Sequence, residues 1–199
     1  MIHVLKAAAK VNPGIVEAFR SLDVATVYEA SGRKGYIDCF IRPAYPSARV
    51  CGLAYTVQCA PADNLMLHKA LQRAPSGVVL VAAVGGDHAY GYWGGMMAVA
   101  AQARGIAGLA IDGCVRDSAE LARMGFPVFC RGFSVRGTAK SGLGLINYPL
   151  DFGLQSVFPG DLVLGDGDGM VVVRAADAAE ILEKSLARKK FEEEKSAQL

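Results

Sequence analysis

The sequence predicts an α/β fold on three observations. The chain has 199 residues, of which 52% are hydrophobic and 20% charged, which fits one domain with a substantial core or a domain with a short appendage. Val78–Val84 is a continuous apolar run, typical of a strand covered on both faces. Ile106–Ile111, Ser118–Met124 and Pro127–Cys130 then follow one another as strand, helix and strand, at the spacing of a right-handed parallel crossover.

The first half of the chain is predicted to contain three helices and a strand. Apolar spacing indicates short helices over Val16–Arg20 and Val24–Ala30, with Asp23 placed to cap the second. Arg49–Cys59 alternates and is rich in Val, Tyr and Thr, as expected of a strand. Leu65–Arg73 follows a Pro-containing turn and is predicted to be a helix.

The second half begins with a glycine-rich loop, Gly85–Gly95. The loop leads into Met96–Arg104, which is predicted to be a helix that a glycine ends. Two further strands, around Leu162–Leu164 and Met170–Val173, flank an acidic turn. We take Asp166 and Asp168 in that turn as turn formers, because they lack the further oxygens of a calcium loop.

Residues 175–199 are predicted to form a C-terminal helix that follows an α/β domain over residues 1–174. Ala175–Gln198 has a long helical pattern, and its last part, Arg188–Lys195, is charged nearly all round. Such a helix cannot bury itself within one subunit, so we expect it to project or to pack on a neighbouring copy.

Charge and composition exclude several classes of protein. The formal net charge is +2, with both signs mixed along the chain, so no nucleic-acid-binding surface is expected. Met1–Lys6 lacks the order of a secretory signal, and no apolar run reaches the roughly 18 residues that cross a bilayer. We therefore expect a cytoplasmic protein without a membrane partner. The five cysteines form no C-x-x-C pair and are expected to be reduced and mostly buried.

A helix that begins at Gly94-Gly95 is the first candidate binding feature. Its first backbone N–H groups, near Met96 and Met97, are expected to be unpaired and to face an open space. Such a helix start binds carboxylate or phosphate groups.

Arg116 and Asp117 are the second candidate feature. They follow the strand Ile106–Ile111, at its carboxyl end, where ligands collect in open α/β sheets. Arg116 offers a planar fork for a carboxylate, and Asp117 offers a hard oxygen for a divalent metal. The alternatives are structural: Asp117 with Glu120 also fits a helix capping box, and Arg116 also fits a surface ion pair.

Three stretches of the chain resemble the signature of the RraA-like family: Trp93–Ala98, Ala103–Gly108 and Ile111–Asp117. The resemblance continues on both sides and covers most of the chain. The sequence is similar to the family's class II pyruvate aldolases, which cleave 4-hydroxy-4-methyl-2-oxoglutarate and 4-carboxy-4-hydroxy-2-oxoadipate. The resemblance implies a swivelling β/β/α domain and trimers or hexamers with sites between subunits.

Carried over by position, the resemblance makes Asp117 the direct ligand of Mg²⁺ or Mn²⁺ and Arg116 the partner of the substrate's oxygens. It implies that the backbone N–H groups of Met96 and Met97 hold the pyruvyl carboxylate. It also implies that an acidic residue from a neighbouring subunit's C-terminal helix approaches the metal, with a solvated helix end as the alternative. The candidates for that residue are Glu192, Glu193 and Glu194.

Gly95 is a departure from the aldolases, which usually carry Asp or Glu at this position. The missing carboxylate would have held a metal-bound water, so we expect weak metal binding unless Asp87, His88 or the tail glutamates compensate. Decarboxylation of oxaloacetate forms the same pyruvate enolate and requires less of the site. We therefore expect decarboxylation to survive the change better than aldol cleavage does.

Three further basic residues are candidates for substrate binding. His68 occupies a position like one in the family and could touch the distal carboxylate or assist proton transfer; a structural, hydrogen-bonded histidine is the alternative. Arg33 and Lys34 could bind the far carboxylate of a dicarboxylic substrate, and exposed loop charges are the alternative.

The predicted function is that of a divalent-metal-dependent carbon–carbon lyase. Its substrate is expected to be a small 4-hydroxy-2-oxo di- or tricarboxylic acid cleaved to pyruvate, oxaloacetate that is decarboxylated, or both. The alternative is a non-catalytic RraA-like regulator that binds a ribonuclease or a helicase. Near-neutral charge and the Arg116-Asp117 pair favour the enzyme, whereas Gly95 favours a non-catalytic or altered role.

Overall fold

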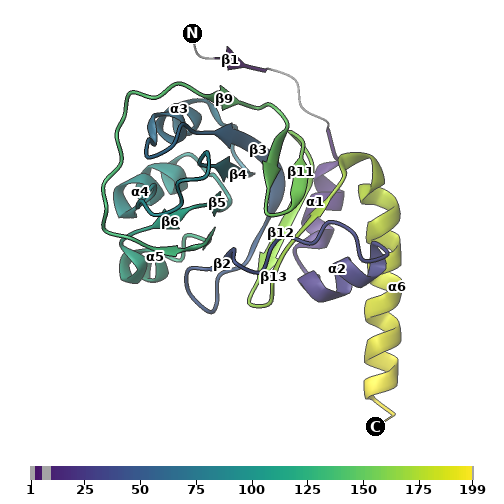
Figure 1. Ribbon diagram of the computed structural model, residues 1–199. Coiled ribbons are helices and arrows are strands. Elements are labelled where there is room, and N and C mark those ends of the chain that lie inside the picture. The colour runs from purple at the N-terminus through teal and green to yellow at the C-terminus, as the bar shows by residue number, and fades with distance from the viewer. Residues whose placement is uncertain (1–2, 6–9, 199) are drawn as a thin grey trace.

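A mixed, nearly closed sheet lies between two groups of helices in the computed structural model, which describes residues 3–5 and 10–198 (Figure 1). Its main path runs in the order β1-β9-β3-β4-β5-β7-β2, and β12 and β13 join it beside β3. The strands of this sheet are β1 (His3–Val4), β2 (Arg42–Pro43), β3 (Val50–Gln58), β4 (Val78–Ala83), β5 (Gly108–Asp112), β7 (Val128–Cys130), β9 (Leu145–Ile146), β12 (Leu162–Asp166) and β13 (Gly169–Val173).

The centre of the sheet is parallel, as the predicted crossover requires. Strands β3, β4, β5 and β7 are parallel neighbours, and α5 (Ser118–Met124) connects β5 to β7. Every residue of β4 is buried, which confirms the strand predicted from the continuous apolar run. β12 and β13 form an antiparallel hairpin, and β12 pairs antiparallel with β3, so the sheet is mixed.

Helices cover the sheet on two sides. α3, α4 and α5 pack on one side, and α1, α2 and α6 pack beside β12 and β13 on the other (Figure 1). Each group of helices packs on the sheet through an apolar cluster. A third apolar cluster lies between strands of the sheet and a small hairpin formed by β10 (Leu150–Phe152) and β11 (Gln155–Val157). The helices are α1 (Pro13–Phe19), α2 (Val24–Ala30), α3 (Leu65–Arg73), α4 (Gly95–Ala103), α5 (Ser118–Met124) and α6 (Ala178–Ser196), and a 3₁₀ turn, Ala175–Asp177, precedes α6.

Several short strands lie outside the elements that the sequence predicts. They have two or three residues each, too few for a hydrophobic period to show, and their positions depend on the strands they meet. Besides β1, β2 and β9, these are β6 (Cys114–Val115), β8 (Gly132–Phe133), β10 (Leu150–Phe152) and β11 (Gln155–Val157).

The cap of α2 differs from the prediction. Asp23 occupies the N-cap position, but its side chain makes no capping hydrogen bond and instead pairs with Arg49 at 3.1 Å. The Val24 N–H donates to Asp166 Oδ2 at 2.9 Å. Asp166 Oδ1 also accepts from the Asp168 N–H, which confirms Asp166 as a turn former. One buried carboxylate thus links the β12–β13 turn to the start of α2.

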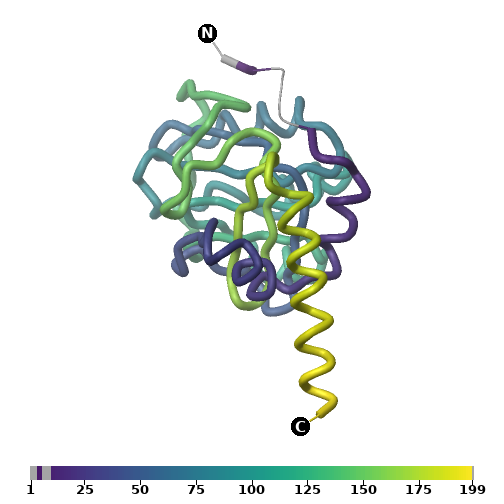
Figure 2. Tube along the Cα trace, turned by 90° about the vertical axis from the view of Figure 1, so that its right-hand side faces the viewer, coloured from purple at the N-terminus to yellow at the C-terminus, as the bar shows by residue number. Residues whose placement is uncertain are grey.

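The C-terminal helix packs partly on its own chain. Ala178 and Ser185 of α6 are buried, and α6 contacts α1 and α2. Further along α6, Lys189 Nζ donates a hydrogen bond to Ser21 O at 3.1 Å, just after α1. Beyond this point the helix extends past the rest of the chain (Figure 2). The expectation that it cannot bury itself within one subunit is therefore wrong for its first half, where Ile181 and Leu182 add to an apolar stripe facing α1 and α2.

None of the described helices is long and apolar enough to cross a bilayer. Half of the Met1–Lys6 segment, on which the expectation of a missing secretory signal depends, lies outside the described residues: Met1, Ile2 and Lys6. The cysteines are free, but only Cys59 and Cys130 are fully buried; Cys51 and Cys114 are partly exposed and Cys39 is exposed. The expectation that most are buried is therefore only partly met.

Candidate active site

Two loops leave the same edge of the sheet and are joined there. Ala83 and Asp112, the last residues of the parallel strands β4 and β5, are register partners. The loop after β4 runs along the segment after β5, and the Arg116 N–H donates to Trp93 O at 2.9 Å. This bond places Gly94 and Gly95, at the start of α4, directly beside the residues that precede α5.

Asp117 is held in a strained conformation toward α4. Its φ is 60°, in the left-handed region that a non-glycine residue adopts only at some cost. Its Oδ2 accepts a hydrogen bond from the Gly95 N–H at 2.9 Å, and its side chain makes no cap on α5. The capping-box interpretation is therefore wrong, since the carboxylate serves the start of the neighbouring helix.

Gly94 is required by close approach. Its backbone is extended, which any residue adopts, but a Cβ built there would lie 2.5 Å from Asp117 Oδ2 and 3.1 Å from Arg116 Cγ. A side chain at this position would push both functional groups away. The predicted glycine pair thus does open the helix start to close contact.

The free N–H groups at the start of α4 are fewer than expected. The Gly95 N–H is taken by Asp117, and the Met97 N–H donates to Gly94 O at 3.1 Å. The Met96 N–H makes no hydrogen bond within residues 10–198. The Met96 side chain is 83% exposed, whereas Met97 is buried. Of the two predicted donors, Met96 is the one that remains open to a ligand.

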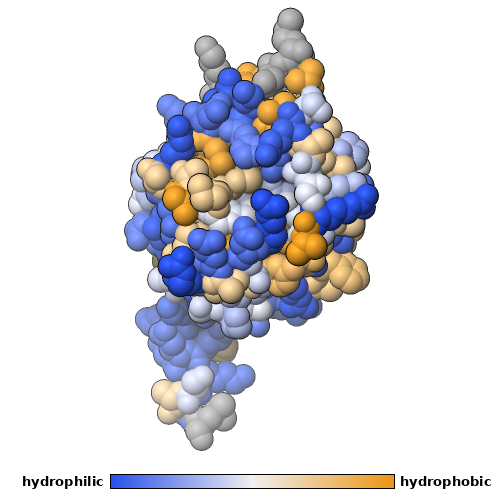
Figure 3. Space-filling model, turned by 90° about the vertical axis from the view of Figure 1, so that its left-hand side faces the viewer, coloured by the Kyte–Doolittle hydropathy of each residue, from blue (hydrophilic) through white to orange (hydrophobic). Residues whose placement is uncertain are grey.

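Arg116 and Asp117 line an open hollow of about 710 Å³. Arg116 Nε is 3.9 Å from Asp117 Oδ2, and both side chains are about half exposed. Phe133 and Val135, from the strand β8 and the loop after it, line the same hollow and are exposed. Figure 3 shows the side of the molecule that carries α3, α4 and α5, where hydrophobic residues are scattered among hydrophilic ones. The site is thus open to solvent in one copy of the chain.

Glu120 is a site residue whose place the sequence interpretation missed. Its carboxyl group lies over Gly95, with Cδ 2.7 Å from where a Cβ on that glycine would be. The signal was available, because Glu120 is three residues beyond Asp117 and so lies on the same side of α5. The capping-box interpretation had given it a different role.

His68 is not brought to this group by any hydrogen bond or ion pair within residues 10–198. It lies on α3, where burial and the nearby charge of Lys140 lower the pKa of its imidazole. Its Nε2 is buried and makes no hydrogen bond within the described part of the chain. His68 is therefore a neutral ring near pH 7 with an unused polar atom.

Of the two loop residues proposed to compensate for Gly95, His88 is engaged elsewhere through Nδ1, whereas the Asp87 carboxylate makes no hydrogen bond or ion pair within the described residues. His88 Nδ1 donates to Asp112 O at 2.6 Å, and the Asp112 carboxylate pairs with Arg131. The Asp87 carbonyl accepts from Tyr92 Oη at 2.6 Å, which holds this loop down. These bonds fix the loop to the end of β5.

The other basic and acidic candidates lie beside α2 and α6, across the sheet from α4 and α5 (Figure 1). Arg33 forms an ion pair with Glu29 at 3.2 Å, and Lys34 is its exposed neighbour. Glu192 and Glu194 pair with basic residues one turn earlier on α6, and Glu193 is exposed. Within one chain these residues stand apart from Asp117.

The donor set at the site suits a hard cation that keeps most of its own water. Within the described residues, no three His, Cys, Asp or Glu side chains lie close enough to hold a metal. Asp117 Oδ1 makes no hydrogen bond to residues 10–198, and Glu120 lies beside it in sequence and space. Mg²⁺ is typically bound by one or two carboxylates, waters and substrate, so these residues fit Mg²⁺ or Mn²⁺.

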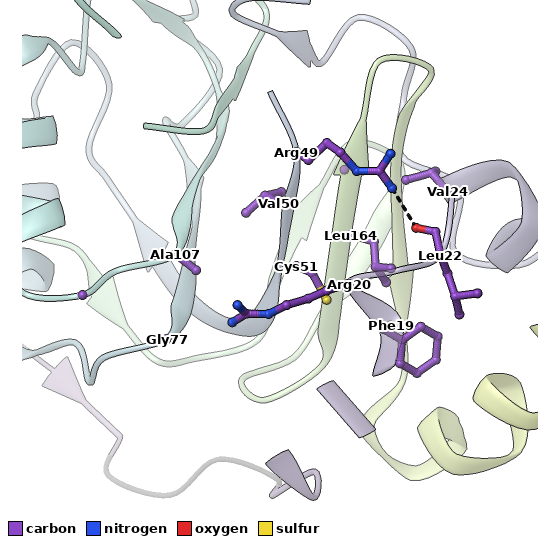
Figure 4. Close-up of a pocket in the computed structure, with 12 residues that line it drawn as sticks. Phe19, Arg20, Leu22, Val24, Arg49, Val50, Cys51, Gly77, Ala107 and Leu164 are labelled. Atoms are coloured by element: carbon purple, nitrogen blue, oxygen red, sulfur yellow. Dashed lines mark hydrogen bonds between the residues drawn. The ribbon is translucent and has the colours of Figure 1, made fainter. Parts of the chain in front are cut away.

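A second hollow, of about 430 Å³, lies between α1 and the strands β3 and β12 (Figure 4). Arg20 and Arg49 line it, but each is already paired: Arg20 with Glu17 at 3.3 Å and Arg49 with Asp23 and Leu22 O. Among the described residues no carboxylate lines this second hollow, whereas Asp117 lines the first, so the Arg116–Asp117 hollow is the stronger candidate for a cation and an acid.

The chain is similar in sequence and in structure to known proteins. The chain is 34% identical over 170 residues to a protein of Halalkalibacterium halodurans provisionally named 4-hydroxy-4-methyl-2-oxoglutarate aldolase, covering 85% of this chain and 81% of that protein. A crystal structure of an uncharacterised protein from Pseudomonas syringae superposes with a TM-score of 0.82 at 30% identity, covering 92% of this chain and 90% of that one.

A second solved structure, Streptomyces coelicolor RraAS2, is described as an unusual member of the RNase ES inhibitor RraA family. It has a TM-score of 0.83 at 26% identity and covers 94% of this chain and 98% of that chain. The family model described as Aldolase/RraA matches residues 21–172, which include the whole of the site. The chain is therefore a member of the RraA-like family.

Proposed function

We propose that the chain is a divalent-metal-dependent carbon–carbon lyase that releases pyruvate from a 4-hydroxy-2-oxo di- or tricarboxylic acid and decarboxylates oxaloacetate. The observation that carries the proposal is that Arg116 and Asp117 line one open hollow while Asp117 is bonded to the start of α4 through the Gly95 N–H. A guanidinium, a carboxylate and a free backbone N–H are the groups that a small 2-oxo acid and its cation require. The aldolase name of the relative from Halalkalibacterium halodurans points the same way.

The two carboxylate oxygens of Asp117 have different roles. Oδ2 is fixed by the Gly95 N–H, and Oδ1 is left to ligate Mg²⁺ or Mn²⁺. When bound, such a cation supplies Lewis-acid stabilisation of the negative charge that develops on the 2-oxo oxygen. The left-handed backbone at Asp117 sets the direction of the carboxylate before any ligand arrives.

Arg116 and Met96 orient the substrate. The Arg116 guanidinium is a planar donor beside Asp117, and it balances the charge of a carboxylate or an enolate oxygen. The Met96 N–H, at the positive end of α4, donates to the pyruvyl carboxylate. Both groups hold the 2-oxo acid end, which the two reactions share, so the same residues serve cleavage and decarboxylation.

The partner of this chain is proposed to be a second copy, in a trimer or a hexamer. The hollow around Arg116 is open in one chain, and the exposed Phe133 and Val135 border it. An adjoining subunit would remove these apolar side chains from water and narrow the hollow around the substrate.

The test is pyruvate release from oxaloacetate and from 4-carboxy-4-hydroxy-2-oxoadipate, with Mg²⁺ and with a chelator. We expect turnover that the chelator abolishes and that added Mg²⁺ or Mn²⁺ restores. Asp117→Asn keeps an acceptor for the Gly95 N–H but loses the charge, so kcat/KM should fall about 100- to 1000-fold. Glu183→Gln, on the exposed face of α6, is the matched control.

Unchanged turnover in Asp117→Asn would show that the metal-ligand assignment is wrong. No metal-dependent turnover by the native chain on either substrate would favour the regulatory role instead. In that case, binding of a ribonuclease or a helicase becomes the property to measure.

A further inference from the structure

A cavity of about 600 Å³ lies at the end of β4 that faces away from the Arg116–Asp117 hollow. Val78, the first residue of β4, lines this cavity and pairs with Leu53 of β3. Ala83, the last residue of β4, pairs with Asp112 beside the candidate active site. The cavity lies where β1, the residue that follows β9 and the end of α3 come together (Figure 1). The two sites are therefore at opposite ends of the same strand.

Apolar side chains form most of the cavity's wall. Leu5, Leu53 and Pro75 line it, and Leu5 is 42% exposed. The backbone of Leu5 is held in place on both sides, because its N–H donates to Ile146 O at 3.2 Å and its carbonyl accepts from Asn147 Nδ2 at 2.8 Å. Small-molecule sites in proteins are mostly apolar cavities of this size with a few polar groups that orient the ligand. The wall thus suits the apolar body of a small ligand.

Arg73, in the last turn of α3, is the one charged side chain among the described residues that line the cavity. It forms no ion pair within residues 3–5 and 10–198, and its hydrogen bond there runs from Nη1 to Lys69 O at 3.3 Å. A guanidinium carries five N–H donors, so most of them remain available. Because no described carboxylate lines the cavity, the charge of Arg73 favours an anionic ligand.

Tyr55 supplies a second polar group to the same cavity. Its side chain is buried, yet its hydroxyl makes no hydrogen bond within the described part of the chain, whereas buried tyrosine hydroxyls usually have a partner. Burial raises the pKa of Tyr55 and the charge of Arg73 lowers it, so the guanidinium lies within electrostatic range of the hydroxyl. A neutral O–H donor and a cation lining one cavity match the two oxygens of a carboxylate.

We infer that this cavity is a second ligand site, which binds a small monocarboxylic acid with an aromatic or aliphatic body. The carboxylate is bound by Arg73 and the Tyr55 hydroxyl, and the body packs against Leu5, Leu53 and Pro75. One cation among the described lining residues matches one carboxylate, rather than the several charges of a di- or tricarboxylic acid. The inference goes beyond the proposed function, because neither Arg116 nor Asp117 lines this cavity.

The first test compares three probes on the full-length native chain by isothermal titration calorimetry. EDTA is present, so that no bound cation offers a carboxylate a further site. Phenylacetate should bind saturably. Phenylacetamide has the same shape without the charge, and its Kd should be at least about 10-fold higher. Acetate has the charge without the apolar body and should bind more weakly than phenylacetate does.

The second test locates the binding of phenylacetate with single substitutions. Arg73→Gln removes the cation and should raise the Kd about 10- to 100-fold, whereas Tyr55→Phe keeps the ring and should raise it about 3- to 10-fold. Arg104→Gln is the matched control, because Arg104 is also an exposed arginine that donates to an α3 carbonyl, Gln72 O at 3.4 Å, but does not line the cavity. Thermal unfolding shows whether each variant is folded.

Arg116→Gln separates the two sites and should leave the Kd for phenylacetate unchanged. A raised Kd in Arg116→Gln with an unchanged Kd in Arg73→Gln would mean that the probe occupies the candidate active site, and the inference would be wrong. Equal affinity of the native chain for phenylacetate and phenylacetamide, or no saturable binding of phenylacetate, would also overturn it. None of these results bears on the proposed lyase activity, which the pyruvate assay tests separately.

Discussion

Asp63 and Asp117 both lie next to the start of a helix, yet the chain uses them in opposite ways. Asp63 is 4% exposed and accepts hydrogen bonds from the N–H groups of Leu65, Ser141 and Gly142, at 2.6 to 2.8 Å. Asp117 is about half exposed and accepts one, from Gly95. Asp63 connects the loop that contains residues 141 and 142 to the start of α3. Asp117, by contrast, has one carboxylate oxygen that accepts no hydrogen bond from the described residues.

The difference separates structural carboxylates from functional ones. Asp161 and Asp166 resemble Asp63, since each is buried and accepts from two backbone N–H groups. Glu120 resembles Asp117, because its carboxylate is partly exposed and has a free oxygen. A carboxylate whose acceptors are all used stabilises the fold, and one with spare acceptors and strained backbone is available for binding.

The largest expected effect on stability is at Asp63. Asp63→Asn removes the charge and one of the two acceptor oxygens, so the free energy of unfolding should fall by about 2–4 kcal/mol. Urea unfolding measures the change. Asp117→Asn is the matched substitution and should change the free energy of unfolding by less than about 0.5 kcal/mol, because Asn tolerates a left-handed backbone and still accepts from Gly95. Equal losses at the two positions would contradict the distinction.

An intermediate effect is expected at the cap of α2. Asp166→Ala leaves the Val24 N–H without its acceptor and opens the β12–β13 turn, so stability should fall by about 1–2 kcal/mol. Asp23→Ala removes only an exposed ion pair with Arg49 and should change stability by at most about 0.5 kcal/mol. If urea unfolding showed a larger loss of stability for Asp23→Ala than for Asp166→Ala, Asp23 would be the cap of α2, as the sequence predicts.

The smallest expected effect is a change with pH in the contribution of Asp63 to the free energy of unfolding. Burial raises the pKa of its carboxyl, but the amides of Ser141, Leu65 and Gly142 outweigh burial and hold the pKa below its ordinary value of 3.8. Because the folded pKa is depressed, the contribution is complete above pH 3.8 and is lost as the pH falls through the folded value.

The stability difference between the native chain and Asp63→Asn should therefore shrink in acid. Urea unfolding at a series of pH values between neutrality and acid would measure it. For Asp117→Asn the difference should stay small throughout the same series. A difference for Asp63→Asn that grows in acid would mean that its carboxyl is stabilised in the protonated form.

The sequence predicted most of the framework because its signals are local. Leu65–Arg73, Val78–Ala83 and Ser118–Met124 carry their periodicity or apolar runs within themselves, so their positions were foreseen to within a residue. The two- and three-residue strands, such as β6 and β8, carry no period and were missed. Their backbone pairs form only after the segments that follow β5 and β7 have met.

The candidate site was predicted in part. Gly94, Gly95, Arg116 and Asp117 were found because a glycine pair, an arginine and an acid at strand ends are visible in the chain itself. The structure brings these four together. It leaves His68 on α3 without a bond to them, and it gives the Met97 N–H to Gly94.

The sequence by itself determined the order of the helices and the longer strands, the open glycine turn at the start of α4 and the identity of the charged groups at the sheet's edge. Only the tertiary structure decided which carboxylate lies against which backbone segment of a distant element. Asp166 reaches Val24 across 142 residues, Asp117 reaches Gly95 across 22, and Glu120 fills the space beside Gly95. The physical reason is range: periodicity and turn chemistry act between near neighbours, whereas these contacts exist only once distant elements have packed.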